Sequence, residues 1–510
     1  MATRLTTRRA FLRSTSIGGV TALSGGLGFL SRLPRVSVVE ASVSAGDVRF
    51  GEGIEPLVRL IEETPRKQLL ERVANAIHGG RSYRDVLAAL LLAGVRNVQP
   101  RPSVGFKFHC VLVVNSCHLA SLTGPEEDRW LPIFWALDYF KSSQADEAGR
   151  SGWRMQPVNE SLVPDAEHSR AMFVEAMDQW DVDKADAATA GLVRTAGATD
   201  VFNLFAQYAA RDYRSIGHKA IYLANSWRTL QVIGWEFAEP VMRSLAFALL
   251  NHTDEPNPSN SDLEADRPWR QNAELLDRMP ENWLSGTRDD AVPEHLFDAF
   301  RTGSPLAAAE TAADALSHGV GPQSVWDGVF VGAGELLMRQ PGIIGLHGLT
   351  TANAMHYLWR NAADDRLRRH LLLQACSFQP MFRDSAKGRG SLGDTLVGDL
   401  NPIPIESGND AVGEIMSDIS ANKRQAAAKV RAYLASGGSA QDLIDASRRV
   451  LFLKGRDAHD YKFSSAVLED YGHVSAPWRD QFLALSVFNL RGTGDADNTL
   501  VERTRSTLAG

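Results

Sequence analysis

Histidine is the residue type that could most readily do chemistry in this chain, because neutral imidazole is a common ligand of Zn, Cu, Fe and Ni. Six of the 13 histidines fall at related positions along the chain, and these are His109, His118, His218, His347, His356 and His459. The spacing His-x5-Asn-x2-His occurs twice, beginning at His109 and again at His347. We expect the histidines to hold a transition metal ion, Fe, Cu or Zn. Buried structural histidines and metal-free acid–base catalysis are the two alternatives.

Helix geometry favours one histidine from each related position as a ligand. Nine residues of continuous helix end on the opposite face, about 13 Å further along the axis. Residues His109 and His118 therefore cannot bind one ion together without a break in the helix. The predicted metal ligands are His109, His218, His347 and His459, and the secondary candidates are His118 and His356. The second ring nitrogen of each ligand needs a hydrogen-bond acceptor, for which nearby candidates are Asp212, Asp460, Asn115, Asn225 and Asn353.

Basic side chains close to these histidines in the sequence could orient a substrate. Arg214 and Lys219 flank His218, and we expect one of them to bind an anionic or oxygenated substrate or to stabilise developing negative charge. Lys107 and Lys462 lie near two other histidines. The alternative is that these cations are solvated and the neighbouring aromatic residues pack between helices.

The three cysteines cannot build a disulfide framework. Cys110 and Cys117 are seven residues apart, which places them on one helical face but about 10 Å apart along the axis. We expect these two and Cys376 to be buried as small hydrophobic residues. Thiolate ligation of a soft metal is the alternative.

The elements that would position the histidines form a fourfold internal repeat. The four segments are residues 66–145, 183–252, 306–385 and 424–492. In each, an Ala-rich run ends at a small turn, and a Ser/Thr-x-x-Asp-like signal starts the next helix. A histidine-bearing segment and an apolar helix follow, so about four helices are expected per repeat, arranged as a duplicated pair. Such repeats bury their apolar faces only against one another. We therefore predict an all-α fold, closed around a central axis on which the histidines converge.

A single domain is expected over residues 46–510, with long connecting loops at 253–305 and 386–423. The first loop has a predicted short helix near residues 272–278. The second contains the run from Asn401 to Pro404, Asn-Pro-Ile-Pro, which cannot form a regular helix. Connections of this length often act as lids or binding loops.

The first 45 residues are typical of an export signal. Arg8 and Arg9 precede Phe11 and Leu12 in a pattern that resembles the twin-arginine signal, and a Gly-rich apolar stretch follows. We expect the Tat translocase to export the protein to the periplasm or beyond, without stable membrane insertion. A disordered or tail-anchoring N-terminus is the alternative.

Loss of this segment would make the protein more acidic. The full chain has 54 basic and 61 acidic residues, and the segment holds six Arg and one Glu. Its removal leaves 48 basic and 60 acidic residues, a net charge of −12. Such a surface has no electrostatic reason to bind nucleic acid or anionic lipid.

Two histidine-bearing segments resemble the helices of the questin oxidase-like family. They are IGHKAIYL, which begins at Ile216, and HGLTTANAMHYL, which begins at His347. The resemblance implies an all-helical oxidoreductase. No Gly-x-Gly-x-x-Gly motif follows a predicted strand, and the sequence lacks Walker, Gly-x-Ser-x-Gly and Cys-x-x-Cys-His motifs, so a nucleotide held by a standard fold is not expected.

Together, these features predict an exported, histidine-centred, metal-dependent oxidoreductase that acts on a small organic substrate. Two other functions are kept open. One is a helical-repeat binding or scaffold protein with structural histidines, and the other is a metal-dependent hydrolase.

Overall fold

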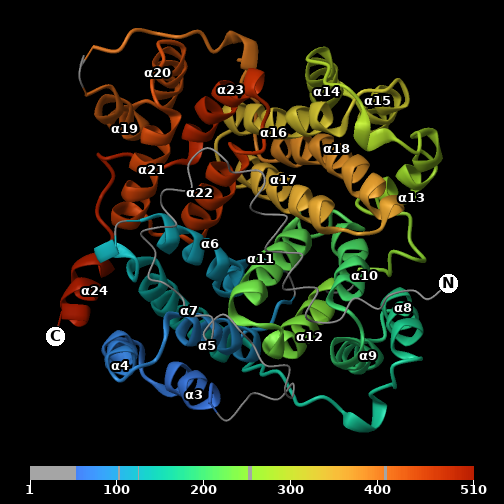
Figure 1. The fold of residues 1–510 in the computed structure, drawn as a ribbon, viewed down its shortest axis with the longest axis vertical. Helices are drawn as coiled ribbons and strands as arrows, with labels where there is room; N and C mark the ends of the chain where they lie inside the picture. The colour runs from blue at the N-terminus through green and yellow to red at the C-terminus, as the bar shows by residue number, and fades with distance from the viewer. Residues whose placement is uncertain (1–52, 102–103, 125, 251–254, 407–409, 510) are drawn as a thin grey trace. The chain divides into compact units, whose positions relative to one another are not determined.

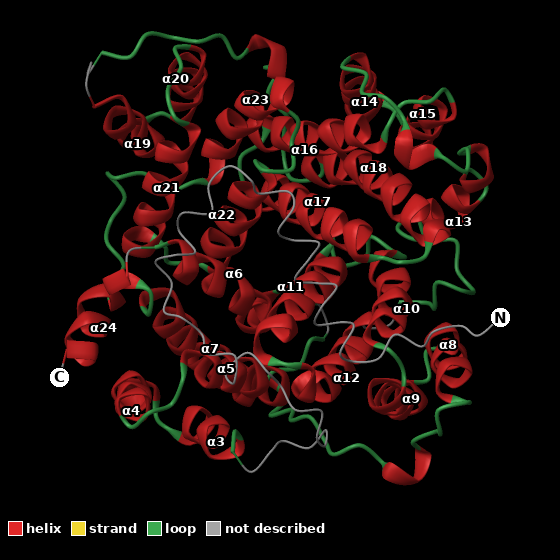
Figure 2. Cartoon of the chain, in the orientation of Figure 1, coloured by secondary structure: helices red, strands yellow, loops and turns green. Residues whose placement is uncertain are grey.

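The computed structural model describes residues 53–101, 104–124, 126–250, 255–406 and 410–509, and these residues fold as helices and connecting turns (Figures 1 and 2). They form 22 α-helices. Within these ranges there is no strand, and a single isolated bridge joins Thr287 to Val320. The all-α prediction is confirmed. The predicted export signal lies outside the described residues.

Among the described helices, none combines the length and the apolar character that crossing a bilayer requires.

Contacts divide the chain into two compact units, each assembled from segments that are distant in the sequence, where one domain over residues 46–510 was expected. Of the described residues, those within 1–111, 137–205 and 226–259 form the first unit, and those within 112–136, 206–225 and 260–510 form the second. Helices inside the first unit are α3 (Glu55–Glu63), α4 (Arg66–His78), α5 (Tyr83–Asn97), α8 (Ser169–Gln179), α9 (Val182–Thr195) and α12 (Ala238–Leu249). Four helices contribute residues to both units, namely α6 (His109–Thr123), α7 (Leu131–Arg150), α10 (Ala198–Ala210) and α11 (His218–Ile233).

The remaining helices lie in the second unit. They are α13 (Arg267–Ala273), α14 (Ala291–Thr302), α15 (Pro305–Ser317), α16 (Pro322–Arg339), α17 (Ile343–Asn361), α18 (Asp365–Lys387), α19 (Ala411–Ala421), α20 (Lys423–Ala435), α21 (Ala440–Lys454), α22 (Ala458–Asp470), α23 (Ala476–Ser486) and α24 (Leu500–Ala509).

Each of the four segments that the sequence analysis set apart contains four α-helices in chain order. They are α4–α7, α9–α12, α15–α18 and α20–α23. In the first and fourth segments the second helix is capped as its sequence signal indicates, because Ser82 accepts a hydrogen bond from the backbone N–H of Asp85 and Ser439 from that of Asp442. In every segment the predicted histidine lies within the first five residues of the third helix. The structural equivalence of the segments and their closure around an axis stay predictions.

The two segments expected to be connecting loops also contain helices. The first includes α13 and α14, and the second includes α19. Helix α14 buries Val292, Leu296, Phe297 and Phe300, an apolar stripe with helical spacing. The high Asp, Asn and Pro content of the whole segment hid this stripe. The Asn-Pro-Ile-Pro run is irregular, as expected.

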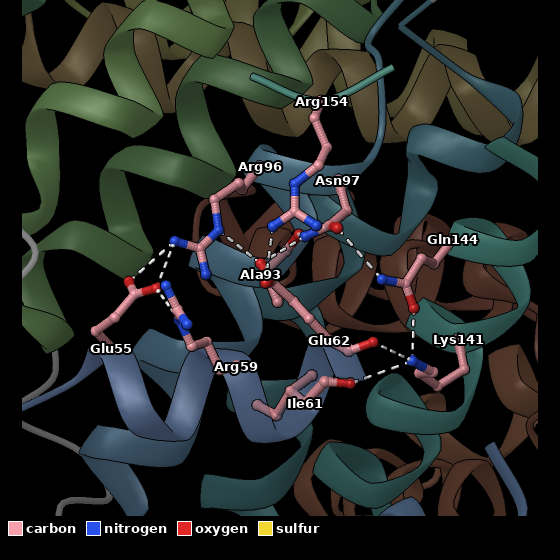
Figure 3. Close-up of polar contacts among 10 residues, drawn as sticks. All are labelled: Glu55, Arg59, Ile61, Glu62, Ala93, Arg96, Asn97, Lys141, Gln144 and Arg154. Carbon is pink, nitrogen blue, oxygen red and sulfur yellow. Dashed lines mark hydrogen bonds and ion pairs between the residues drawn. The ribbon is translucent and has the colours of Figure 1, made fainter. Parts of the chain in front are cut away.

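A buried polar network ties together α3, α5 and α7 in the first unit (Figure 3). Glu62 is 7% exposed and accepts hydrogen bonds from Arg96 Nε at 2.6 Å, Asn97 Nδ2 at 2.6 Å and Arg154 Nη2 at 3.0 Å. Lys141 donates to the backbone carbonyl of Glu62 at 2.7 Å. Every polar partner here is charged or a strong donor, so the buried Glu62 carboxylate is compensated.

In the second unit α17 is buried along most of its length. It packs against α16 and α18, which lie beside it in Figure 1, and against α22. Every residue from Ile344 to His356 is buried. A helix enclosed on all sides is normally apolar, but this one carries two histidines, two threonines and an asparagine in that stretch. These polar side chains therefore need partners inside the unit, and they form the basis of the candidate site.

Candidate metal centre

A strained turn places His218 at the start of α11. Ile216 and Gly217 have φ angles of 43° and 81°, and the left-handed conformation costs a β-branched residue such as Ile216 about 1–3 kcal/mol. Glycine is required at position 217, because a Cβ atom there would overlap the side chain of Thr351 in α17. Backbone strain of this size concentrates at functional sites. Here it allows the turn before His218 to approach α17 closely.

His218 and His347 face each other inside the second unit. Their Nε2 atoms are 3.0 Å apart and their ring centroids 4.5 Å apart. Both rings are buried, with exposed fractions of 4% and 1%. This contact joins α11 to α17 and brings two of the predicted ligands together.

The hydrogen bonds of the other ring nitrogens fix the tautomer of both histidines. His218 Nδ1 lies 2.8 Å from the carbonyl oxygen of Ser215, and His347 Nδ1 lies 2.6 Å from that of Ile343. A carbonyl oxygen only accepts, so each Nδ1 carries a proton and donates it. In the neutral rings each Nε2 therefore presents a lone pair, and the two lone pairs face each other.

Two lone pairs at this distance repel unless a positive charge lies between them. A proton is one candidate. However, burial, reinforced by the positive charge of Lys462, lowers the pKa of both rings well below the ordinary 6.5. For His347, the neighbouring His218 also lowers the pKa. A proton shared by the pair is therefore disfavoured at neutral pH.

A metal ion is the other candidate, and the pair fits one. Nitrogen ligands bound at about 2.0–2.1 Å, with bond angles of roughly 90–110°, lie about 2.8–3.4 Å apart. The observed 3.0 Å falls within this range. Metal-bound histidines also usually donate the second ring N–H to a carbonyl or carboxylate oxygen, as both residues do here.

His459 brings a third imidazole to His347. Their ring centroids are 5.2 Å apart, and one nitrogen of each ring lies within 4.8 Å of the other. His459 occupies the first turn of α22, where the Asp457 side chain accepts from its backbone N–H at 2.7 Å and contacts Nδ1 at 2.6 Å. This contact lowers the pKa of Asp457 to about 2. The result is a carboxylate–histidine pair of the type that supports metal ligands.

The other predicted ligands have different positions. His109 begins α6 and is 5% exposed. It belongs to the first unit, which ends its opening segment at Val111, and its role as a ligand stays a prediction. His118 is buried in the part of α6 that belongs to the second unit, and burial lowers its pKa to about 4. His356 is nine residues beyond His347 on the continuous helix α17.

The two predicted catalytic cations are held in buried ion pairs. Arg214 Nη2 contacts Asp266, and Arg214 Nε lies 2.8 Å from the same carboxylate. Lys219 Nζ lies 2.6 Å from Asp212 Oδ2. The side chains of all four residues are 2% exposed or less. The pairs account for the burial of these charges, so a structural role is sufficient to explain them, and their catalytic role stays a prediction.

Lys462 differs from these cations because, within the described chain, its Nζ has no hydrogen-bond partner. It lies one turn after His459 in α22 and is 2% exposed. Burial lowers its pKa to about 7, so near neutral pH the amine is about half protonated, and its uncharged form can lie close to a cation. Lys107, in contrast, pairs with Glu147 in the first unit at 2.7 Å.

Sequence reasoning predicted the clustering of the histidines better than the groups that contact their rings. The acceptors of the imidazole N–H groups are two backbone carbonyls and Asp457, none of which was among the candidates. Two of those candidates have other partners, since Asp460 pairs with Arg491 at 2.9 Å and Asn353 donates to Asp470 at 2.8 Å. The Asp-x-His spacing at the N-terminus of α22 is the signal that could have identified Asp457.

The three cysteines are buried and unpaired by disulfides. Burial raises the pKa of the Cys110 thiol to about 12 and also raises the pKa values of Cys117 and Cys376 well above their ordinary value. The expectation that they are buried is confirmed.

Comparison of the chain with protein-family models, with curated proteins and with solved structures gave no match. The resemblance to the questin oxidase-like family and the export signal therefore stay predictions.

Proposed function

We propose that this protein is an exported, metal-dependent oxidoreductase whose centre is formed by His218, His347 and His459. The observation that carries the proposal is the approach of two Nε2 lone pairs to 3.0 Å while both Nδ1–H groups donate to carbonyl oxygens. This arrangement is complementary to a metal ion and disfavours a proton. Imidazole ligands suit Cu, Fe and Zn, and a bound redox-active ion would exchange electrons with the substrate.

The residues around the histidines define what the protein itself contributes. Ser215, Ile343 and Asp457 hold the three rings in one tautomer and one orientation. Burial of His218 and His347 excludes bulk water from the ligand nitrogens. Lys462 provides an amine whose hydrogen-bonding capacity is not used within the described chain, and it would bind an oxygen atom of the substrate.

Metal analysis of the purified mature protein tests the proposal. We expect about one equivalent of Cu or Fe to be lost in His218→Ala and in His347→Ala, together with the activity, and to be retained in His295→Ala. His295 is exposed on α14 and serves as the matched control. Metal-free wild-type protein, or unchanged metal content in both site variants, would contradict the proposal.

The same samples separate the two alternative functions. An optical spectrum without ligand-field or charge-transfer bands, together with bound Zn, would favour the metal-dependent hydrolase. A metal-free protein whose site variants lose about 1–3 kcal/mol of stability, but keep ligand binding, would favour the scaffold.

A further inference from the structure

A second cluster of ligand-type side chains lies within the second unit, apart from the cluster formed by His218, His347 and His459. His356, Asp470 and His473 each offer one ligand atom, and these three atoms lie within 4.8 Å of one another. His356 is 5% exposed, Asp470 is fully buried and His473 is partly exposed. We propose that these three residues bind a divalent transition metal ion at a second site, independent of the His218–His347 centre.

The charge around Asp470 favours a cation. Asn353 Nδ2 donates to Asp470 Oδ1 at 2.8 Å and to Glu469 Oε2 at 2.9 Å, so two carboxylates share one neutral amide. Asp470 is also the last residue of α22, where the helix dipole places partial negative charge. A carboxylate at the C-terminus of a helix attracts cations, and a divalent ion bound here would add a positive charge beside it.

Aromatic side chains hold the His356 ring in place. Its centroid lies 4.8 Å from that of Trp326, 5.2 Å from Phe330 and 5.7 Å from Trp359. The ring of His473 lies 4.7 Å away. These ring contacts restrict the orientation of the imidazole, as a preorganised ligand requires.

Hydrogen bonds hold the loop that carries His473 on both sides of this residue. Its backbone N–H donates to the Asp470 carbonyl at 2.7 Å, and its own carbonyl accepts from Gln323 Nε2 at 2.8 Å. Two residues later, the backbone N–H of Ser475 donates to Asp327 Oδ1 at 2.8 Å. His473 is therefore held beside Asp470 by α16 as well as by α22.

Two imidazoles and one carboxylate form a ligand set that Zn²⁺ and Fe²⁺ both use, with remaining positions open to water or substrate. The partial exposure of His473 leaves such a position accessible. Arg360 opposes binding, because its Nη1 donates to His473 Nδ1 at 3.2 Å and carries a positive charge. It is exposed and can turn away, but its removal should strengthen metal binding.

Zinc titration of the full mature chain by calorimetry tests this site. In His473→Gln we expect the Zn²⁺ stoichiometry to fall by one equivalent relative to wild type, whatever the first site contributes. Because Asn353 orients the carboxylate, Asn353→Ala should weaken Zn²⁺ binding by roughly 10–100-fold, whereas Arg360→Ala should tighten it. His295→Gln is the control and should change neither value.

Unchanged Zn²⁺ stoichiometry in both His473→Gln and Asp470→Asn would overturn the proposal. Asp470 is fully buried, so Asp470→Asn is included only if its circular dichroism matches wild type. His473 is partly exposed, and its variant decides the question alone if the other does not fold. Repeating the titration in His218→Ala separates the two sites, because the second site should still take up one equivalent there.

Discussion

The buried His370 should make the protein sensitive to mild acid. Its ring stacks on Trp269 with centroids 3.5 Å apart, and Nε2 donates to the Trp269 carbonyl at 2.7 Å. Burial, with a smaller contribution from the charge of Arg366, lowers the pKa of this ring from 6.5 to about 4. Between these two values the unfolded chain binds more protons than the folded one, so the unfolding free energy falls as the pH falls. At 1.36 kcal/mol per pH unit, the loss is about 2 kcal/mol by pH 5 and about 3 kcal/mol by pH 4.

The assay compares wild type with His370→Gln in urea unfolding followed by circular dichroism, between about pH 7.5 and pH 4. Glutamine keeps a donor for the Trp269 carbonyl but does not titrate. At pH 7.5 the variant should be less stable, because it loses the ring stacking. This difference should shrink by about 3 kcal/mol as the pH approaches 4, since only wild type loses the histidine contribution. His295→Gln, at an exposed position, is the control.

A difference between wild type and His370→Gln that stays constant over this pH range would refute the reasoning. It would mean that His370 has the same proton affinity in the folded and unfolded chains. The buried stack on Trp269 would then not exclude the charged ring.

Three further predictions follow from other parts of the chain. Lys219→Met should lower the free energy of unfolding by about 3–5 kcal/mol, because it leaves Asp212 buried without its cation. Adding Asp212→Leu should recover most of this loss, as measured by urea unfolding. Equal losses in the single and double variants would argue against the pair. The three buried cysteines should not react with Ellman's reagent in the native protein and should all react in denaturant, since burial suppresses the thiolate; rapid native labelling would contradict this. Arg8→Lys with Arg9→Lys should abolish export in cell fractionation, and export of that variant would show that the N-terminus is not a twin-arginine signal.

The helical architecture could be predicted from local sequence, because apolar spacing and capping residues act within one or two turns. Ser82 and Ser439 cap helices where their spacing to Asp85 and Asp442 indicates. The run from Asn401 to Pro404 is irregular because its two prolines cannot continue a helix, which is also a local effect. Helix α14 was missed because its apolar stripe lies within a polar segment, so composition over a long window concealed a short pattern.

The candidate site was predictable in its residue types but not in its contacts. Recurrence along the chain indicated His109, His218, His347 and His459, and the second unit brings the last three of these together. His356 lies nine residues beyond His347 on the continuous helix α17, the spacing on which the sequence argument separated them. In contrast, no local spacing could show that Asp470 and His473 approach His356, because these contacts depend on how α22 and the following loop pack on α17.

The charged residues show the same limit. Lys219 and Asp212 are seven residues apart, close enough that a local pair could have been considered. The partner of Arg214 is Asp266, 52 residues away, and only tertiary structure reveals it. Lys462 lies near histidines in sequence, but its burial without a hydrogen-bond partner is also a property of the packed unit.

Anomalous diffraction from crystals of the metal-loaded protein tests the central claim most directly. Data collected at the absorption edge of the bound element should show a peak about 2.0–2.2 Å from Nε2 of both His218 and His347. The absence of such a peak, with the two imidazoles turned apart or bridged by water, would contradict the metal centre.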